Sequence, residues 1–334
     1  MSESDGRLTE NKRLEDHWYA VAQSEDVDDR PHSVQLLNSR YVLWRDLKGS
    51  LVATSGLCPH RQMPLSEGEV QNGCLVCPYH GWMFGEKGRC EKIPSSAVGL
   101  PIPPKAHLKN FETIEKYGLI WLSPGKPKEP LFAIPQEEDP SFRRINTEVQ
   151  RWEVAATRMV DNFLDITHFP YVHTGTFGSV QQREVPDIEL EKLGEGFFGY
   201  SYDVLAANPS EARFSSGSEE MVVGRSMTTG FHLPFIVRST IAYESGLDHI
   251  ILLVSTPIDE NNSYFTFVVW RNDDFDIPAE EIISFDRAIG EEDRLMLENL
   301  NGSLPLGQTD LANVRADKTS VEWKRQLKEL LKND

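Results

Sequence analysis

Apolar and polar residues alternate in short runs over the first third of the chain. The runs at 41–45 (YVLWR), 51–54 (LVAT) and 118–122 (GLIWL) are separated by turn residues. Short alternating runs bounded by turns are typical of strands that bury one face. The pattern predicts a compact, mostly β domain over residues 15–125, preceded by an N-terminal arm over residues 1–14.

A segment rich in proline follows this domain. Residues 124–135 (PGKPKEPLFAIP) hold four prolines, and proline lacks the amide hydrogen that helices and central strands need. We therefore expect a linker here, and a second domain over residues 126–334.

The second domain combines helical periodicity with longer alternating runs. Apolar spacing predicts helices at 154–169, 278–300 and 321–331, with Pro170 ending the first of them. Alternation predicts strands at 196–204, 237–243, 249–256 and 263–271. These strands suggest one antiparallel sheet. The expected fold class is α+β: an all-β first domain, then a domain whose antiparallel sheet is flanked by helices, of the helix-grip type.

Length and charge narrow the class of protein. A chain of 334 residues suits two domains, and its longest apolar run, at 250–254, is far shorter than a bilayer span. The formal net charge of −18 disfavours nucleic acid and anionic membranes as partners. The N-terminus has no visible secretory signal, so we expect a cytoplasmic protein.

The cysteines are crowded into one region. All four lie between Cys58 and Cys90, which favours metal binding over disulfides. The motifs Cys58-x-His60 and Cys77-x-x-His80 each offer one thiolate and one imidazole. This order lets both cysteines hold one iron and both histidines the other, as a Rieske [2Fe-2S] cluster requires. A structural zinc site is the alternative, because zinc can also use two residues of each type.

A second group of candidate ligands lies on the first predicted helix. Asp161, Asp165 and His168 are spaced by four and three residues, so one helical face would carry all of them. A turn after Pro170 can bring His173 beside His168. Two histidines and one carboxylate with open positions form the non-heme Fe(II) arrangement. A solvated helix face is the alternative for the two aspartates.

The carboxylate that would complete an iron site with His168 and His173 is expected on the second predicted helix. The apolar stripe of that helix passes close to both Glu292 and Asp293, whereas Glu291 lies on the other side. Periodicity therefore excludes Glu291 and leaves the other two open. An ion pair with Arg287 or Arg294 is the alternative role for Asp293.

Both regions resemble one family. The stretches CPHRQMPLSEGEV (58–70) and LVCPYHGWMF (75–84) are similar to the Rieske domain of ring-hydroxylating and demethylating oxygenases. The stretch DNFLDITHFPYVH (161–173) resembles the iron-site helix of the same enzymes. The chain is identified as a member of the Rieske non-heme iron oxygenases, in the monooxygenase and demethylase branch.

The resemblance implies a ligand set for each metal centre. It gives the cluster ligands as Cys58, His60, Cys77 and His80. It gives the ligands of a mononuclear Fe(II) as His168, His173 and Asp293, because Glu292-Asp293 is similar to the family's Glu-Asp pair in which the aspartate binds iron.

The resemblance also implies how the two centres communicate. Asp165 occupies the position that links the cluster of one subunit to the iron of its neighbour in a head-to-tail homotrimer. Asn162 stands where a polar residue beside the iron ligands is common.

The implied activity is that of a terminal oxygenase. Such an enzyme uses O2 and externally supplied electrons to hydroxylate or oxidatively demethylate a small, aromatic or heterocyclic substrate. NAD(P)H is expected to act only through a separate reductase, with or without a ferredoxin. Two alternatives stay open: a cis-dihydroxylating dioxygenase within the class, and a Rieske electron carrier without oxygenase activity outside it.

Several further residues are candidates of lower rank. Cys74 and Cys90 have no place in the cluster motif, and we expect both to be buried as small hydrophobic residues. We expect His232 and His249 to be hydrogen-bonded within the fold. The aromatic residues that could line a substrate pocket are Phe231, Phe235, Phe265, Phe267 and Trp270. Strand alternation turns about half of such residues into the core instead.

Overall fold

The chain divides into two compact units, Met1–Pro130 and Leu131–Asp334. The computed structural model describes residues 7–178, 183–210, 213–307 and 311–332, so the first six residues of the expected N-terminal arm lie outside the described part. The division falls at Pro130, somewhat later than the boundary expected after Gly125. Leu14, in the expected arm, is fully buried.

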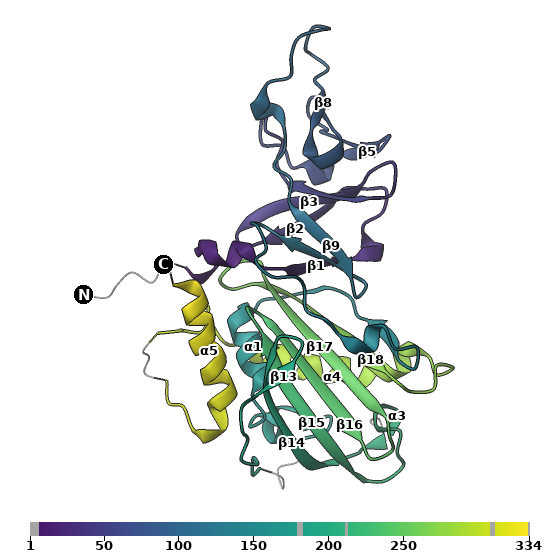
Figure 1. The fold of residues 1–334 in the computed structure, drawn as a ribbon, viewed down its shortest axis with the longest axis vertical. Helices are drawn as coiled ribbons and strands as arrows, with labels where there is room; N and C mark the ends of the chain where they lie inside the picture. The colour runs from purple at the N-terminus through teal and green to yellow at the C-terminus, as the bar shows by residue number, and fades with distance from the viewer. Residues whose placement is uncertain (1–6, 179–182, 211–212, 308–310, 333–334) are drawn as a thin grey trace, which may run out of the picture. The chain divides into compact units, whose positions relative to one another are not determined.

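The first unit consists of three small antiparallel sheets, coloured purple to blue in Figure 1. One sheet has the order β1-β10-β9, formed by Tyr19–Gln23, Leu119–Ser123 and Glu112–Lys116. The second has the order β2-β3-β4, formed by His32–Leu36, Ser39–Arg45 and Leu51–Ser55. The third has the order β5-β6-β7-β8, formed by Glu69–Gln71, Cys74–Val76, Met83–Phe84 and Cys90–Lys92.

Short 3-10 helices lie before, between and after the strands. Those of the first unit are Leu8–Glu10, Lys12–Asp16, Ser24–Asp26, Leu65–Glu67, Glu86–Gly88 and Pro104–Ala106. Within the described ranges of the second unit they are Pro135–Glu137 and Arg315–Asp317.

A separate hydrophobic core lies under the β5–β8 sheet. Trp44, Leu65, Leu75 and Phe84 are fully buried there. The core also includes Cys58, Cys77 and Cys90, so the loops that carry the cluster motif rest on a packed base. The prediction of a mostly β first domain is confirmed.

The second unit is built on one antiparallel sheet of eight strands. Its strand order is β11-β18-β17-β16-β15-β14-β13, and β12 also pairs with β18. The strands are Arg143–Asn146 (β11), Gln150–Trp152 (β12), Glu191–Gly194 (β13), Phe197–Ala207 (β14), Val222–His232 (β15), Ile236–Tyr243 (β16), Asp248–Pro257 (β17) and Ser263–Arg271 (β18). The strand predicted at 263–271 coincides with β18, whereas β15 was not predicted.

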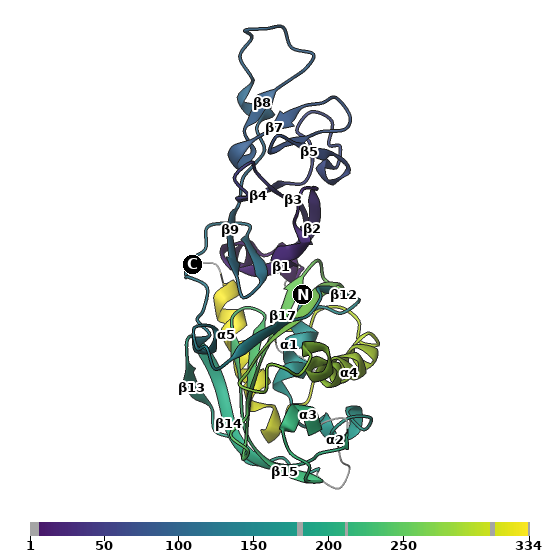
Figure 2. The same ribbon diagram turned by 90° about the vertical axis from the view of Figure 1, so that its right-hand side faces the viewer.

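Helices cover one face of this sheet. They are Ala156–Leu164 (α1), Phe169–Val172 (α2), Arg213–Ser216 (α3), Ala279–Leu297 (α4) and Lys318–Leu331 (α5). Helix α1 packs on β15, β16 and β17, and α4 lies beside α1, as Figures 1 and 2 show. Met159 of α1, Ile282 of α4 and Phe267 of β18 share one core. The predicted α+β class is confirmed.

The prediction of a single helix over residues 154–169 is wrong. Helix α1 ends at Leu164, and Asp165 has extended backbone angles. The Asp165 carboxylate accepts hydrogen bonds from the backbone amides of Thr167 (2.8 Å) and His168 (3.2 Å). A side chain that bonds to nearby amides in this way competes with continuation of a helix. Asp161, Asp165 and His168 therefore do not share one helical face.

The prediction that Pro170 ends the first helix is also wrong. Pro170 lies in the first turn of α2. Proline suits this position because amide hydrogens of the first turn have no partner within the helix. The four-residue helix α2 places His168 immediately before its start and His173 immediately after its end.

One glycine motif has the spacing of a dinucleotide-binding loop. Gly194, Gly196 and Gly199 follow the pattern Gly-x-Gly-x-x-Gly, but they lie in the hairpin between β13 and β14. A dinucleotide site needs this pattern between a strand and a helix. The glycines instead serve the hairpin: Gly194 and Gly196 have φ near +80°, and a Cβ at Gly199 would meet the Thr229 carbonyl oxygen at 2.0 Å.

None of the helices in the described ranges is long and apolar enough to cross a bilayer.

Candidate metal centres

The two loops with the Cys-His motifs have the same backbone arrangement. In the first loop the Cys58 amide donates to the Met63 carbonyl, and in the second the Cys77 amide donates to the Trp82 carbonyl, each at 2.9 Å. The second loop turns at Gly81, whose φ of +68° suits glycine. Each loop thus closes around its cysteine and projects its histidine.

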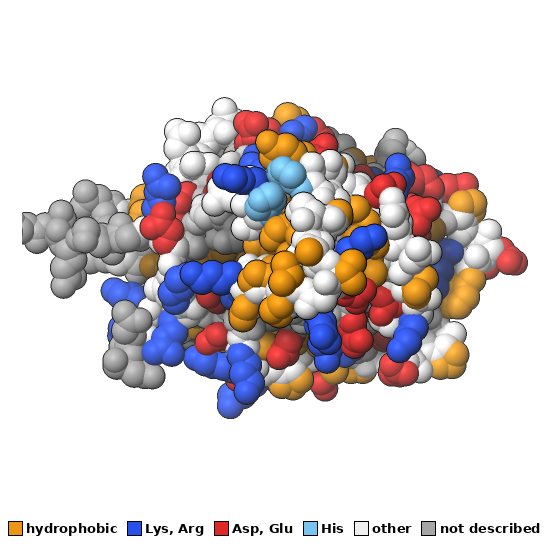
Figure 3. Space-filling model, turned by 90° about the horizontal axis from the view of Figure 1, so that it is seen from above, with side chains coloured by type: hydrophobic (Ala, Val, Ile, Leu, Met, Phe, Trp, Pro, Cys, Tyr) orange, Lys and Arg blue, Asp and Glu red, His pale blue; other side chains and the backbone are white. Residues whose placement is uncertain are grey.

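The candidate cysteine ligands and the candidate histidine ligands differ in their exposure to solvent. Cys58 and Cys77 are buried, whereas His60 and His80 are exposed, with ring centroids 4.5 Å apart. The Trp82 ring stacks on His60 at 4.9 Å. Figure 3 shows histidine side chains in pale blue at the surface, beside a hydrophobic area. The cysteine side of the site is therefore dry, and the histidine side faces outward.

The candidate ligands of the first unit are grouped differently from those of the second. Among the described residues, only His168, His173 and Asp293 form a set of three or more potential ligands whose atoms all lie within 4.8 Å. Cys58, His60, Cys77 and His80 are not grouped in this way, as expected if the two cysteines and the two histidines bind different irons of one cluster.

The electrostatics of the loops also fit a cluster. Burial raises the pKa of Cys58 to about 11, so a thiolate there needs strongly positive partners, such as ferric ions. Partial desolvation and the neighbouring His80 lower the pKa of His60, which favours the neutral imidazole that binds metal.

The other two cysteines differ from each other. Cys90 is buried, as predicted. The same prediction for Cys74 is wrong, because this residue is only half-buried and its Sγ lies 3.4 Å from the Glu91 carboxylate. Cys74 stands at the start of the short strand β6, near the edge of the core.

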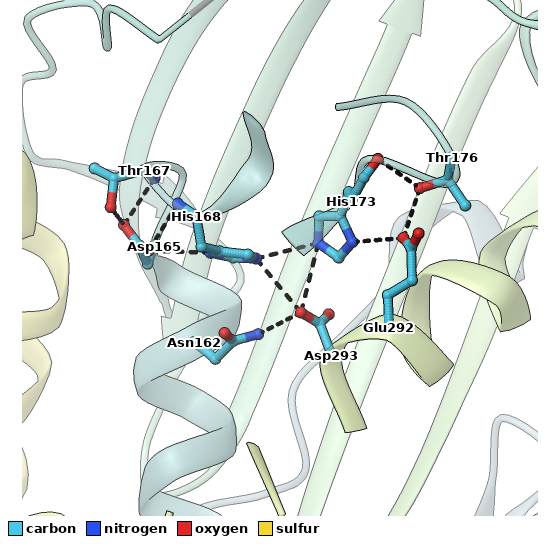
Figure 4. A network of polar contacts seen from close by, with 8 residues as sticks. All are labelled: Asn162, Asp165, Thr167, His168, His173, Thr176, Glu292 and Asp293. Atoms are coloured by element: carbon cyan, nitrogen blue, oxygen red, sulfur yellow. Dashed lines mark hydrogen bonds and ion pairs between the residues drawn. The ribbon is translucent and has the colours of Figure 1, made fainter. Parts of the chain in front are cut away.

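In the second unit three candidate ligands converge. The Nε2 atoms of His168 and His173 are 3.1 Å apart, and Asp293 Oδ1 lies 3.4 Å and 3.5 Å from them (Figure 4). Their side chains are 11%, 1% and 7% exposed. Three lone-pair donors that point at a common position, out of water, fit a metal ion.

Each imidazole is held at its other nitrogen by a carboxylate. Asp165 Oδ2 lies 3.0 Å from Nδ1 of His168, and Glu292 Oε2 lies 3.0 Å from Nδ1 of His173 (Figure 4). A carboxylate at Nδ1 places the proton on that nitrogen and leaves Nε2 as a metal donor. Both rings are thus oriented for binding.

The carboxylates are positioned in turn. Asn162 Nδ2 donates to Asp293 Oδ1 at 2.9 Å. Glu292 accepts hydrogen bonds from the Gly175 amide at 3.0 Å and from the Thr176 hydroxyl at 2.8 Å. The role of Glu292 at His173 was not foreseen, because it depends on how α4 packs beside the turn after α2.

The charges around the site favour a cation. Burial opposes a charge on His168, but the carboxylates of Asp165 and Asp293 outweigh it and raise the pKa of His168 to about 9. Burial lowers the pKa of His173. Burial works against ionisation of Asp165, yet hydrogen bonds from His168 and Thr167 lower its pKa. Positive charge between these groups is therefore stabilised.

The ion pair proposed as the alternative role of Asp293 is absent from the described residues. Arg294 pairs with Glu291, and Arg287 pairs with Glu148. Asp293 faces the Nε2 atoms of the two histidines instead. Glu292 contacts His173 at Nδ1, on the opposite side of the ring.

Two other candidates lie away from the site. Asp161 contacts the Ser320 hydroxyl and lies 3.7 Å from Lys324 Nζ on α5. His232 Nδ1 lies 3.1 Å from the Gly196 carbonyl. Neither reaches the group around Asp293.

A cavity of about 140 Å³ opens beside the three ligands. Phe265 and Phe267 line it, whereas Phe231, Phe235 and Trp270 do not. Phe265 and Phe267 are two residues apart on β18, so they share the face that carries the helices, while Trp270 points to the other face.

His249 also lines the cavity and is hydrogen-bonded. The Arg271 guanidinium donates to its Nδ1, which leaves the proton on Nε2, 3.3 Å from Asp286 Oδ2.

Another residue that lines the cavity, Arg225, was not predicted from the sequence. Nothing in the run VVGRSMTTGFH marks it as buried.

Two protein families match this chain, one over each unit. Residues 17–112 match the Rieske [2Fe-2S] domain family, and residues 152–333 match the vanillate O-demethylase oxygenase C-terminal domain family. The chain belongs to the Rieske non-heme iron oxygenases, in the monooxygenase and demethylase branch. The first unit is thus a Rieske domain that holds a [2Fe-2S] cluster.

Individual relatives agree with this class. The chain is 29% identical to methylxanthine N1-demethylase NdmA of Pseudomonas putida over 335 residues, covering 96% of this chain and 90% of the relative. It is 28% identical to the putative toluene-4-sulfonate monooxygenase iron-sulfur subunit TsaM2 of Comamonas testosteroni, over 84% and 86%.

Solved structures have the same fold. The structure of Pseudomonas putida CBB5 NdmA with caffeine superimposes with a TM-score of 0.83 at 28% identity, covering 97% of this chain and 92% of the other. Dicamba monooxygenase superimposes with a TM-score of 0.79 at 24% identity, over 98% of both chains. The family match and the relatives together identify the chain as a terminal oxygenase, supplied with electrons by a reductase, and disfavour the electron-carrier alternative.

Proposed function

We propose that His168, His173 and Asp293 bind one Fe(II), and that Cys58, His60, Cys77 and His80 bind the cluster. The observation that supports the iron site most is the convergence of three ligand atoms within 4.8 Å at the wall of a cavity. An iron ion bound there supplies the redox chemistry by which O2 is reduced beside the substrate.

The surrounding residues prepare this site. Asp165 and Glu292 keep the two imidazoles in the binding tautomer, and Asn162 holds one oxygen of Asp293. Aromatic walls such as Phe265 and Phe267 exclude water from the cavity. A dry cavity protects reactive species from side reactions with solvent.

We propose that the reaction is monooxygenation of a small aromatic or heterocyclic compound, in particular oxidative removal of an O- or N-methyl group. In demethylation, O2 with a pair of electrons and a pair of protons converts a methoxy group to a hydroxyl group, formaldehyde and water. The relatives support this choice, because the names of two of them describe demethylation and monooxygenation.

Electron delivery completes the proposal. A separate NAD(P)H-dependent reductase, with or without a ferredoxin, reduces the cluster. In a head-to-tail homotrimer the cluster of one subunit serves the iron of its neighbour, and Asp165 bridges the two. Asp165 is suited to this role because it already contacts Nδ1 of an iron-ligand candidate and its side chain is 25% exposed.

Two measurements test the proposal together. Iron analysis of the purified protein should give about three irons per chain, whereas an electron carrier would give about two. Oxygen uptake with a surrogate reductase should be screened across methoxy- and N-methyl-aromatics and scored for formaldehyde. A cis-diol product would instead support the dioxygenase alternative, and full iron loading without any product from the screen would count against demethylation.

A further inference from the structure

The cavity beside the candidate iron site contains a buried cation. Arg225 lies on β15 and is 7% exposed. Its guanidinium carbon lies 5.4 Å from the ring centroid of Tyr243 and 6.0 Å from that of Phe177. Both rings line the same cavity. Arg225 also lines a neighbouring groove, so an anion can approach it from outside.

The Arg225 side chain has no polar partner within the described ranges. Its Nε is buried and unbonded, and no carboxylate there lies in ion-pair range of the guanidinium. Two carboxylates line the same cavity, and neither is in ion-pair range of Arg225. Asp286 Oδ2 lies 3.3 Å from His249 Nε2 without forming a hydrogen bond, and Asp293 faces the two histidine ligands. Burying an unpaired charge is costly, so such a group calls for an anion.

The geometry of the guanidinium leaves its donors available. The planar guanidinium contacts the rings of Tyr243 and Phe177 through cation–π interactions and not through hydrogen bonds. Its N–H donors lie in the guanidinium plane, in the fork that binds a carboxylate through two parallel hydrogen bonds. The aromatic contacts thus hold the side chain in place without using these donors.

The size of the cavity restricts the rest of the ligand. At about 140 Å³ it is close to a cavity of about 150 Å³ that is known to take up benzene. A single aromatic ring therefore fits beside the iron ligands, with little room for a second ring unless side chains move.

We propose that the substrate is a single-ring aromatic carboxylate, whose carboxylate pairs with Arg225 while its ring lies in the cavity. This inference rests on the proposed function, since it names the substrate class of the same site. It makes Arg225 a specificity-determining residue.

Binding of matched probes tests the proposal without turnover. The probes are 2-, 3- and 4-methoxybenzoate, each paired with its neutral isostere, the methoxybenzamide. Affinities for the anaerobic holoenzyme are measured by calorimetry. We expect at least one acid to bind about tenfold or more tightly than its amide, as a charge-assisted pair provides.

Variants then assign the preference to one residue. Arg225→Gln should remove the preference for the acid while the amide still binds, and Arg225→Lys should keep part of it. Arg238→Gln is the matched control. Arg238 lies on the adjacent strand β16 and also stacks on a ring, that of Phe197, at 4.3 Å, but it does not line the cavity. This control should keep the full preference.

The opposite results are equally clear. Wild-type protein that binds every amide as tightly as its acid, or that binds no probe, overturns the proposal whatever the variants do. An acid preference that persists in Arg225→Gln overturns the role of Arg225. Formaldehyde from neutral methyl-aromatics, without an acid preference, would leave the proposed function standing and reject only this inference.

Discussion

The two candidate metal centres are encoded over very different lengths of chain. The candidate cluster ligands lie between Cys58 and His80, on two loops with the same backbone closure. The candidate iron site joins the turns around α2 to α4, and the contact between His173 and Glu292 spans 119 residues. The first centre thus needs only a local fold, whereas the second needs the packed sheet that brings α1 and α4 together.

The largest effect is expected from removing a candidate ligand of the cluster, the centre that is encoded locally. Cys77→Ser removes a proposed cluster ligand, so the protein should lose about two of the three irons expected per chain and all product formation, because electrons no longer enter. The candidate iron site lies in the other unit and should keep its single iron. Iron analysis with visible and EPR spectra checks this. Loss of all three irons would show that the two centres are not independent.

Asp165 tests the connection between the centres. Asp165→Ala should keep both metals, measured with iron in excess, but lose coupled product formation, since the proposed bridge is removed. The readouts are iron content and product formed per O2 consumed. Asp161→Ala is the control, because Asp161 contacts α5 and not the histidines. Normal product formation in Asp165→Ala would refute the bridge.

The same contrast explains what the sequence could predict. Two short motifs predict the cluster ligands, and the alternation at 263–271 predicted β18 with its bounds. Asp293 and Glu292 are adjacent on α4 and both approach the histidines, so periodicity alone could not divide their roles. The end of α1 depends on hydrogen bonds to one carboxylate, and the burial of Arg225 depends on packing across strands.

A smaller effect is expected at the carboxylate that orients His173. Glu292→Gln keeps the size of the side chain but weakens the bond to Nδ1 of His173. Loss of such an orienting group typically lowers metal affinity or activity by about 10- to 100-fold. Iron affinity, measured by competition with a chelator, checks this.

The neighbouring residue provides the control for this comparison. Glu291 lies on the outer face of α4 and pairs with Arg294, so Glu291→Gln should leave iron affinity unchanged. Equal effects of the two substitutions would mean that Glu292 acts through the stability of α4 and not through His173.

The smallest effect concerns the turn that separates α1 from α2. The Thr167 hydroxyl donates to Asp165 Oδ1 at 2.7 Å, and Thr167→Val removes this bond while keeping the shape of the side chain. Because the Thr167 amide still donates to the same oxygen, the turn should persist, and stability to urea should fall by about 1 kcal/mol.

Thr174 offers a matched control, since it is exposed just beyond His173, and Thr174→Val should change stability by less than about 0.5 kcal/mol. If Thr167→Val also lost iron, the orientation of Asp165 would depend on the hydroxyl as well as on the amides. The non-local centre would then rely on a local turn, and the contrast between the two centres would be one of degree.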